Sequence, residues 1–427
     1  MNLFEIIPLK KPVKKEINLS GSKSITNRAL IIASLTSGIS FLYNYSLSED
    51  SQVLIEILKT SGIAIEKKED YLKISGGIDK FLNVFDKTFN VKMAGTTMRF
   101  LTGLFSLIKS RVILDGEPRM RERPISDLVL ALQSLGVKIS YLEKEGFPPI
   151  KIEGGTINKN KVLISGKISS QFISSLLMIA PLIKGGLLIK VKDKLVSSAF
   201  VDLTILVMKD FGVEVKVDKE KNEYFVSQSS YQSRSYSIEP DAASCGYFFA
   251  IAALTKSCIS VNLPSFSQPD SQLIFILEKM GCFVKKEGEK ITVCGPKKLK
   301  PVSIFMENCP DSSMTLAVIA STVSGVTKIF GLSTLKVKES DRLLALKNEF
   351  LKLAIKSEVT DDSITIFGGK PKGGEIETYN DHRMAMSFAV LGTKVAGIKI
   401  KNPQVVKKSF PDFWEKLRFL GVKIKPL

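Results

Sequence analysis

A pattern that recurs about every 70 residues constrains the fold of this chain more than any other feature of its sequence. In each copy a helix ends at a pivot residue, almost always glycine, and an alternating apolar and polar strand follows directly. The six pivots are 67 to 76 residues apart and are Gly62, Gly136, Gly212, Gly281, Ala354 and Gly421. Glycine at such a position adopts the left-handed conformation that closes a helix. Even spacing over six copies predicts an internally repeated structure.

A second repeated feature lies between the pivots, where a small or acidic residue opens a helix with an apolar body. These helix starts are 70 to 74 residues apart and are Ser22, Gly95, Ser169, Asp241, Asp311 and Asp381. Each copy therefore contains two helices and several strands, an alternation typical of α/β layers. For a chain of 427 residues, the most economical assembly is two domains of three units each.

The first three helix starts differ from the last three in a way that predicts anion binding. The segment at residues 19–38 combines a Ser/Gly turn with Lys23 and Arg28 and continues into an apolar helix. Because an N-cap aspartate satisfies its own helix, we expect free N–H groups at the first three starts only. The first half would then hold the more anionic substrate, and the second half would supply carboxylates. Alternatively, all six residues are simple caps, with Lys23 and Arg28 solvated.

The charge of the chain favours acidic partners. It has 61 lysine and arginine residues against 43 aspartate and glutamate residues, a net charge of +18 at pH 7. Such a surplus is typical of proteins that bind nucleic acid, anionic lipid or small phosphorylated substrates. The lysines are scattered instead of forming a basic tail or an aromatic-interleaved patch. We therefore expect small substrates and no nucleic acid.

The cysteines indicate a reducing, cytoplasmic environment. Cys245, Cys258, Cys282, Cys294 and Cys309 are odd in number, lie in the second half and form no CxxC pair. We expect them to be reduced, mostly buried packing residues. The first eleven residues lack an apolar signal core, and no later run has the length of a membrane span. We therefore expect no association with a membrane.

Three polar segments are difficult to explain by packing alone. GEPRMRERP (116–124) contains Arg119, Arg121 and Arg123, which favours an anion site over a solvated loop. KVKESDRLLAL (336–346) is interpreted as placing Lys338, Glu339 and Arg342 on the opening turns of a helix, where like charges four residues apart need an anion or an acid to compensate. YNDHRMAMSFAV (379–390) contains the only histidine, His382, at a helix start beside Arg383, an environment that favours a neutral imidazole.

Seven sequence blocks, taken together, carry a resemblance that none of them carries alone. In chain order they read SGSKSITNRA, AGTTMRFL, GEPRMRERP, ISSQFISSLLMIAPL, PDSSMTLAV, KVKESDRL and DHRMAMSFA. They are collinear and extend from Ser20 to Ala389, nearly the whole chain. This set resembles the signature blocks of the 3-phosphoshikimate 1-carboxyvinyltransferase (EPSP synthase) family.

The resemblance implies an α/β fold of two domains, each of three βαβαββ units, with helix N-termini facing an interdomain cleft. It places residues 1–14 and 240–427 in one domain and residues 15–239 in the other. It also implies transfer of the enolpyruvyl group of phosphoenolpyruvate to the 5-hydroxyl of shikimate 3-phosphate, with release of phosphate, in chorismate and aromatic amino-acid biosynthesis. The reaction passes through a tetrahedral adduct without a metal or organic cofactor. We expect a monomer.

Residue roles follow from the matching motif positions. Those similar to shikimate 3-phosphate binders are Lys23, Ser24, Arg28, Ser169, Ser170, Gln171, Asp311 and Lys338. Those similar to phosphoenolpyruvate binders are Lys23, Gly95, Arg123, Gln171, Arg342, Arg383 and Lys408. The catalytic set is Lys23, Asp311, Lys338, Glu339 and His382.

Within the catalytic set, two carboxylates have distinct expected roles. Asp311 is the candidate base that takes the proton of the 5-hydroxyl, and Glu339 is the candidate acid that protonates the methylene carbon. Lys338 would neutralise developing charge or share the proton transfer. One carboxylate must be ionised and the other must carry a proton at neutral pH, which cations and burial can arrange in opposite directions.

Several positions depart from the usual pattern of the family. They are Ser20, Met93, Phe100 and Thr334, together with the segment Ser197 to Phe200, which replaces the more frequent Ser-Lys-Pro-Tyr. The hydroxyl and the cation expected to contact the shikimate ring and phosphate are missing from that segment. These changes bear on affinity and on sensitivity to glyphosate, expected to compete with phosphoenolpyruvate, more than on reaction type.

Three alternatives remain open from the sequence. UDP-N-acetylglucosamine 1-carboxyvinyltransferase shares the architecture, although the loop around Arg119 lacks the cysteine typical of that enzyme. An RNA-binding or RNA-end-processing protein of similar repeats would explain the basic charge and predicts binding with a steep salt dependence. A catalytically inactive relative is disfavoured because Lys23, Asp311, Glu339 and His382 are intact.

Overall fold

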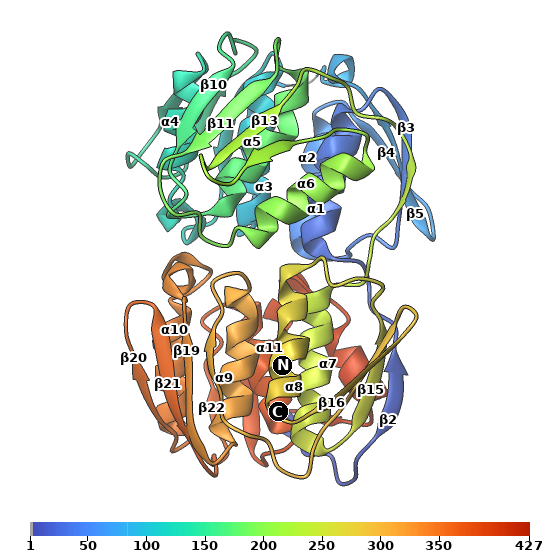
Figure 1. Ribbon diagram of the computed structural model, residues 1–427, viewed down its shortest axis with the longest axis vertical. Helices are drawn as coiled ribbons and strands as arrows, with labels where there is room; N and C mark the ends of the chain where they lie inside the picture. The colour runs from blue at the N-terminus through green and yellow to red at the C-terminus, as the bar shows by residue number, and fades with distance from the viewer. Residues whose placement is uncertain (1–2, 83) are drawn as a thin grey trace. The chain divides into compact units, whose positions relative to one another are not determined.

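The computed structural model describes residues 3–82 and 84–427, and within these ranges the strands form six four-stranded sheets (Figure 1). The same pairing recurs in every sheet: one outer pair of strands is parallel, and the other two pairs are antiparallel. A parallel pair needs a long crossover, which a helix usually provides. The predicted α/β class and the sixfold repetition are confirmed.

The chain divides into two compact units. Unit 1 comprises Met1–Ser20 and Glu239–Leu427, and unit 2 comprises Gly21–Ile238. The first boundary, expected after residue 14, lies instead after Ser20. The reason is that β2 (Lys14–Ile17) pairs with β15 (Cys258–Asn262) and so completes a sheet of unit 1.

Unit 2 contains three of the sheets, each with two α-helices from the same stretch of chain. The first has β14 (Ser235–Ser237), β3 (Gly38–Tyr43), β5 (Tyr71–Gly76) and β4 (Ala64–Lys67), with α1 (Lys23–Leu35) and α2 (Glu49–Thr60). The second has β6 (Phe85–Asn90), β7 (Arg111–Asp115), β9 (Ile150–Glu153) and β8 (Lys138–Tyr141), with α3 (Gly95–Leu107) and α4 (Ser126–Ser134). The third has β10 (Lys161–Ile164), β11 (Leu187–Val191), β13 (Glu223–Val226) and β12 (Lys216–Asp218), with α5 (Ser170–Ile179) and α6 (Ala199–Asp210).

Unit 1 repeats this plan, with β1 and β2 from the start of the chain completing two of its sheets. The first has β16 (Phe283–Glu287), β17 (Lys290–Cys294), β15 and β2, with α7 (Ala242–Thr255) and α8 (Gln272–Lys279). The second has β18 (Ser303–Phe305), β19 (Gly325–Phe330), β21 (Ser363–Gly368) and β20 (Lys356–Val359), with α9 (Ser313–Ser321) and α10 (Arg342–Lys352). The third has β22 (Gly374–Ile376), β23 (Ile398–Lys401), β1 (Leu3–Ile7) and β24 (Lys423–Pro426), with α11 (His382–Gly392) and α12 (Phe413–Phe419).

One helix from each repeat lies in the centre of its unit. In unit 1 the helices α7, α9 and α11 contact one another (Figure 1), and in unit 2 the helices α1, α3 and α5 do the same. Every residue of α9 is buried. A helix buried on all sides carries apolar residues around its circumference instead of on one stripe. These central helices form the cores of the two units and bring their N-terminal ends together.

The pivots have the expected backbone role, whereas the helix starts depart from expectation at Ser22, Ser169 and Asp311. All six pivots have positive φ angles, including Ala354 at φ 59°. Ser169, Asp241 and Asp381 cap their helices through side-chain oxygens. Ser22 is also a cap, since its Oγ accepts from the N–H of Ile25, so the expectation of free N–H groups at the first three starts is wrong at both Ser22 and Ser169. Asp311 is not a cap, because it lies in the 3-10 turn Pro310–Ser312 before α9.

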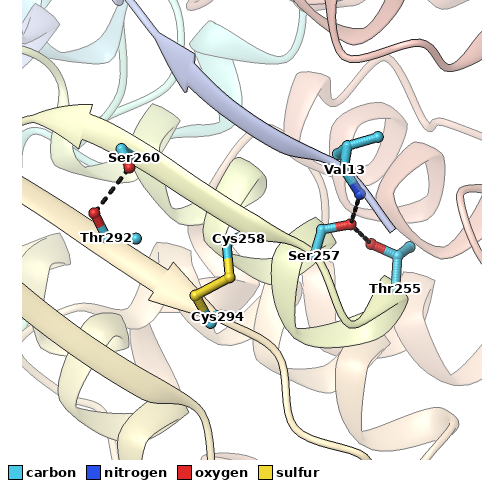
Figure 2. Close-up of a disulfide and its surroundings, with 7 residues drawn as sticks. All are labelled: Val13, Thr255, Ser257, Cys258, Ser260, Thr292 and Cys294. Carbon is cyan, nitrogen blue, oxygen red and sulfur yellow. Dashed lines mark hydrogen bonds between the residues drawn. A yellow bond between two sulfur atoms is a disulfide. The ribbon is translucent and has the colours of Figure 1, made fainter. Parts of the chain in front are cut away.

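The expectation that all five cysteines are reduced is wrong. Cys258 and Cys294 form a disulfide between the adjacent antiparallel strands β15 and β17, where they are direct cross-strand partners with Cα atoms 4.1 Å apart (Figure 2). The pairing register, which the sequence does not reveal, places them together. The other three cysteines are buried thiols, and burial raises the pKa of each: Cys245, Cys282 and Cys309.

None of the helices in the two described ranges combines the length and the apolar character needed to cross a bilayer.

We expect Ala354→Gly to stabilise unit 1 by about 0.5 to 1 kcal/mol, because glycine relieves the strain of a left-handed alanine. The matched change Gly421→Ala should destabilise the same unit by about 1 kcal/mol, since the position has φ 93° and an added Cβ would meet no atom within 4 Å. Urea unfolding followed by the fluorescence of Trp414, the only tryptophan and a buried residue of unit 1, measures both changes. Shifts of the same sign in both variants would contradict the prediction.

Candidate active site

The guanidinium of Arg342 is the centre of a charged cluster in unit 1. Its side chain is 1% exposed and contacts three carboxylates. Nε lies 2.7 Å from Asp381 Oδ2, Nη1 lies 2.7 Å from Asp311 Oδ1, and Nη2 lies 2.9 Å from Glu339 Oε2. Burial alone would lower the pKa of Arg342, but these carboxylates hold it above its usual value. Arg342, predicted to bind phosphoenolpyruvate, therefore also fixes the positions of three acids.

Asp311 is surrounded by three cations, two from segment 336–346 and one from segment 379–390. Its Oδ1 is 3.3 Å from Lys338 Nζ and 2.7 Å from Arg342 Nη1, and its Oδ2 is 3.3 Å from Arg383 Nε. Burial would raise the pKa of this carboxyl, but Lys338, Arg383 and Arg342 together hold it well below its usual range. Asp311 is therefore ionised at neutral pH, the state in which a carboxylate can accept a proton.

The sequence predicted that Lys338 and Glu339 lie on the first turns of a helix. In the structure both residues precede helix α10. The helix begins at Arg342 with Asp341 as its N-cap, and Lys338 follows the 3-10 turn Ser333–Val337. The helix therefore starts after the N-cap Asp341, and Glu339 lies outside it. As a result Glu339 contacts Arg342 and, at 3.6 Å, the Nζ of the buried Lys408.

The start of α11 supplies the remaining charges of this cluster. Asp381 accepts from the N–H of Arg383, and its Oδ1 lies 3.7 Å from Nδ1 of the buried His382. Arg383 donates to the hydroxyl of Tyr247 at 3.3 Å, and burial raises the pKa of Tyr247 to about 12. His382 is thus a first-turn residue of α11, as predicted, beside a carboxylate and a cation.

A second group of residues gathers at the helix starts of unit 2. Lys23 begins α1, and its Nζ forms an ion pair of 2.8 Å with Asp50, a buried residue of α2. Thr97 in the first turn of α3 donates to the carbonyl of Asp50 at 3.3 Å. Asp50 therefore ties Lys23 to the start of the neighbouring helix.

Gly95 allows two guanidinium groups to approach the start of α3. A Cβ at this position would lie 2.4 Å from Nη1 of Arg99 and 2.6 Å from Nη1 of Arg123. Arg99 donates to the Gly95 carbonyl at 2.9 Å, and Arg123 donates to the Met93 carbonyl at 3.4 Å. Both arginines are buried. The missing side chain thus makes room for cations here.

Only one arginine of the GEPRMRERP segment fits the predicted anion site. Arg123 is buried and faces Gly95. Arg119 instead pairs with Glu122 at 2.6 Å, and Arg121 pairs with Asp115 and Glu143 at 2.6 and 2.7 Å. The expectation that all three face an anion is therefore wrong for these two, because nearby acids already neutralise them.

Arg28 is buried among neutral acceptors. Nε donates to Thr204 Oγ1 at 2.7 Å, Nη1 to the Ser24 carbonyl, and Nη2 to the Phe200 carbonyl and Ser174 Oγ. These bonds use four of the five N–H groups of a guanidinium. Burial lowers its pKa to about 9, so it remains charged at neutral pH. The guanidinium also lies 5.3 Å from the ring centroid of Phe100. Phe100 and Phe200, two positions that depart from the usual family pattern, therefore both contact Arg28.

The start of α5 completes the unit 2 group. Ser169 caps the helix by accepting from the N–H of Gln171 at 3.2 Å, and Ser170 is buried in its first turn. Gln171 Nε2 donates to Thr96 Oγ1 of α3 at 3.1 Å. Ser24 lies in the first turn of α1. In unit 2 the predicted residues lie at the starts of the central helices, apart from Arg123, whereas in unit 1 they lie at the starts of α9, α10 and α11 and in the 3-10 turn that contains Lys408.

Four site residues lie outside the predicted set, and each had a weak sequence signal. Asp50 follows the Ser48 cap of α2, and Arg99 belongs to the AGTTMRFL block. Asp381 was predicted only as a helix start. Tyr247 lies in the apolar helix α7, where the neighbouring sequence gives no sign of a functional residue. Among the described residues, no group of three or more His, Cys, Asp or Glu side chains is arranged to hold a metal ion.

The arrangement can bind small polyanions and move a proton next to them. Unit 1 offers an ionised carboxylate among lysine and arginine side chains, and unit 2 offers buried cations and hydroxyls at helix N-termini. Buried charge pairs interact more strongly than exposed ones. Acid-base chemistry on a phosphorylated or carboxylated substrate is the reaction class that these groups support.

Replacing Asp311 by asparagine should destabilise unit 1 at pH 7 by about 3 kcal/mol, because three cations lose their shared carboxylate. The folded pKa of Asp311 is depressed, so its contribution is complete above the unfolded value near 4 and declines as the pH falls below it. The difference between wild type and variant, measured by urea unfolding with Trp414 fluorescence, should therefore narrow below about pH 4. A constant difference from pH 7 to pH 3 would contradict this assignment.

Comparisons with known proteins agree with the geometry. A model of the family described as EPSP synthase (3-phosphoshikimate 1-carboxyvinyltransferase) matches residues 8–417. Proteins named 3-phosphoshikimate 1-carboxyvinyltransferase are 38% identical in Shewanella halifaxensis (strain HAW-EB4), over 99% of this chain and 100% of the relative, and 36% identical in Nostoc punctiforme (strain ATCC 29133 / PCC 73102), over 97% and 98%. The structure of an EPSP synthase from Acinetobacter baumannii matches the fold with a TM-score of 0.83 at 24% identity, over 100% of both chains. The chain therefore belongs to the EPSP synthase (3-phosphoshikimate 1-carboxyvinyltransferase) family.

Proposed function

We propose that this chain transfers the enolpyruvyl group of phosphoenolpyruvate to the 5-hydroxyl of shikimate 3-phosphate and releases phosphate. The observation that carries the proposal is the ionised Asp311 in contact with Lys338, Arg342 and Arg383. Such a carboxylate can take the proton of a hydroxyl while the cations stabilise the adjacent anionic substrate. Membership of the EPSP synthase family supplies the identity of the substrates.

In the first step of the proposed reaction, the 5-hydroxyl oxygen bonds to C2 of phosphoenolpyruvate. Asp311 accepts the hydroxyl proton, and Glu339 delivers a proton to the methylene carbon C3, which becomes a methyl group. The product is a tetrahedral adduct that carries both substrates. Lys338 lies 3.3 Å from Asp311 and is assigned to neutralise the negative charge that develops on the substrate or to share the proton transfer.

In the second step, phosphate leaves C2 and a proton leaves C3, which restores the carbon-carbon double bond. Glu339 is positioned for this return transfer, since the same carboxyl served C3 in the first step. Arg342 and Lys408 contact Glu339 at 2.9 and 3.6 Å and hold its carboxyl in place.

The binding roles are divided between the two groups of residues. Arg342, Arg383 and Lys408 of unit 1, with Lys23, Gly95, Arg123 and Gln171 of unit 2, hold the phosphate and carboxylate of phosphoenolpyruvate. Ser24, Arg28, Ser169, Ser170 and Gln171 hold shikimate 3-phosphate, together with Lys23, Asp311 and Lys338. His382, buried beside Asp381, maintains the start of α11 on which Arg383 stands. We further propose a monomer, because these roles use residues of one chain.

The proposal places the reaction in the cytoplasm. Both substrates are polyanions, and a charged group enters the apolar interior of a membrane only at high cost. Phosphorylated substrates are therefore used in the compartment in which they are made.

Purified protein should release phosphate from phosphoenolpyruvate when shikimate 3-phosphate is the acceptor. The same assay with UDP-N-acetylglucosamine should give at least 100-fold less phosphate, since Arg28 and the serines at helix starts suit a compact phosphorylated ring. A phosphate-release assay with each acceptor, and with phosphoenolpyruvate alone as the blank, measures this. Preference for the nucleotide sugar would overturn the proposed acceptor.

Glu339→Gln should lower kcat by about 10² to 10⁴, because the amide keeps the shape and a hydrogen bond to Arg342 but transfers no proton. The KM of both substrates should change far less than kcat. Glu358→Gln, on the exposed edge strand β20, is the matched control and should retain wild-type kcat. Steady-state kinetics on the three proteins decides the matter, and a kcat for Glu339→Gln within twofold of wild type would remove the residue from the proton transfers.

A further inference from the structure

A lysine-lined pocket lies in unit 1 at the end of the central helices away from the charged cluster. It has a volume of about 130 Å³ and lies at the C-terminal ends of α7 and α9. Its polar lining consists of Lys256, Lys297, Lys298, Lys394, Thr322 and Ser324. The volume is several times that needed by one water molecule. The pocket can therefore admit an ion of the size of phosphate.

The charge of this pocket is one-sided. Four lysines, each exposed, and two hydroxyl residues line it, and no acidic residue does. Within residues 3–82 and 84–427, none of the four lysines forms an ion pair, whereas Lys290 pairs with Glu16 at 2.6 Å and Lys401 pairs with Glu375 at 2.9 Å elsewhere in the unit. Like charges held together without a counter-charge repel one another, and an anion relieves that repulsion.

Lys394 is held against the wall of the pocket by a hydrogen bond. Its Nζ donates to Thr322 Oγ1 at 3.4 Å, a neutral acceptor on the wall of the pocket. Burial and the nearby charge of Lys256 both lower the pKa of Lys394. The ammonium is therefore directed toward the pocket at an electrostatic cost, and a bound anion would remove that cost.

Attraction to helix C-termini explains only part of this charge. A helix C-terminus carries roughly half a negative charge, so α7, α9 and α11 together offer about 1.5 against four lysines. Lys256 is also the C-cap of α7 and has φ 57°, a conformation in which glycine is usual. A lysine at this position carries backbone strain that glycine would avoid. The side chain at this position thus has a use beyond ending the helix.

The wall of the pocket is firmly attached to the sheet behind it. The Cys258–Cys294 disulfide joins the strands that enter and leave it, and Gly295 N–H donates to the Ser257 carbonyl at 2.9 Å. Ser257 Oγ accepts from the N–H of Val13 at 2.9 Å and lies 2.7 Å from Thr255 Oγ1 (Figure 2). These bonds fix the backbone on both sides of the disulfide, from which Lys256 and Lys297 project.

We propose that this pocket binds a phosphate group, either as inorganic phosphate or in a small phosphomonoester. The site is separate from the charged cluster, because the 14 residues of α7 span about 21 Å from its N-terminal to its C-terminal end. It does not depend on the reaction proposed above. Its concave shape and small volume suit a compact anion more than an extended polymer.

Equilibrium dialysis of the full chain with ³²P-labelled inorganic phosphate tests the site. The pocket variant is Lys297→Gln with Lys394→Gln, and the matched control is Lys300→Gln with Lys423→Gln, two exposed lysines of the same unit outside the pocket. Wild type and control should bind one more phosphate per chain than the pocket variant. Phosphate bound by the charged cluster is common to all three proteins and cancels in the comparison.

Unfolding followed by Trp414 fluorescence shows whether each variant is folded. The single change Lys297→Gln, in an exposed loop, should by itself raise the dissociation constant for phosphate at least threefold. Glycerol phosphate should displace the pocket phosphate, as expected for recognition of the phosphate group. Equal phosphate binding by the pocket variant and the control would overturn the proposal. Displacement by a single-stranded oligonucleotide but not by glycerol phosphate would also overturn it and would assign the pocket to nucleic acid.

Discussion

The burial of Arg342 is the constraint on which the geometry of unit 1 depends. Removing a guanidinium from water is costly unless its N–H groups are hydrogen-bonded, and Asp311, Glu339 and Asp381 both accept these bonds and balance the charge of Arg342. Each acid also has a second partner or task. Asp381 caps α11, Asp311 contacts Lys338 and Arg383, and Glu339 lies near Lys408. Movement of the guanidinium would therefore disturb three segments at once.

Unit 2 stabilises its cations by different means. Arg28 is surrounded by hydroxyls and carbonyls, and among the described residues it has no ion pair. A cation with only neutral partners keeps more of its attraction for an incoming anion than one already paired with acids. Lys23 is intermediate, since it pairs with Asp50 and retains a partly exposed side chain. The cations of unit 2 are thus less neutralised by neighbouring acids than those of unit 1.

The periodic features of the fold could be predicted from sequence because they depend on local backbone chemistry. A left-handed pivot requires glycine or tolerates an occasional alanine, so Gly62 and Ala354 could both be located by spacing. Partners distant in the chain could not be predicted. The Cys258–Cys294 disulfide depends on strand register, and the pairing of Arg121 with Glu143 joins residues that are 22 positions apart. The functional blocks were found by resemblance, whereas the contacts among them required the fold.

In the reaction proposed for this chain, the balance of charge in unit 1 would link substrate binding to proton transfer. Without substrate, Lys338, Arg342 and Arg383 stabilise the ionised form of Asp311, which makes it a weak base. A bound polyanion competes for the same cations and adds negative charge beside the carboxylate. Both effects raise the pKa of Asp311 and make it a stronger base. Under the proposed binding roles, the carboxylate therefore gains basicity when the substrate binds, and the cations assigned to bind the substrate also set that basicity.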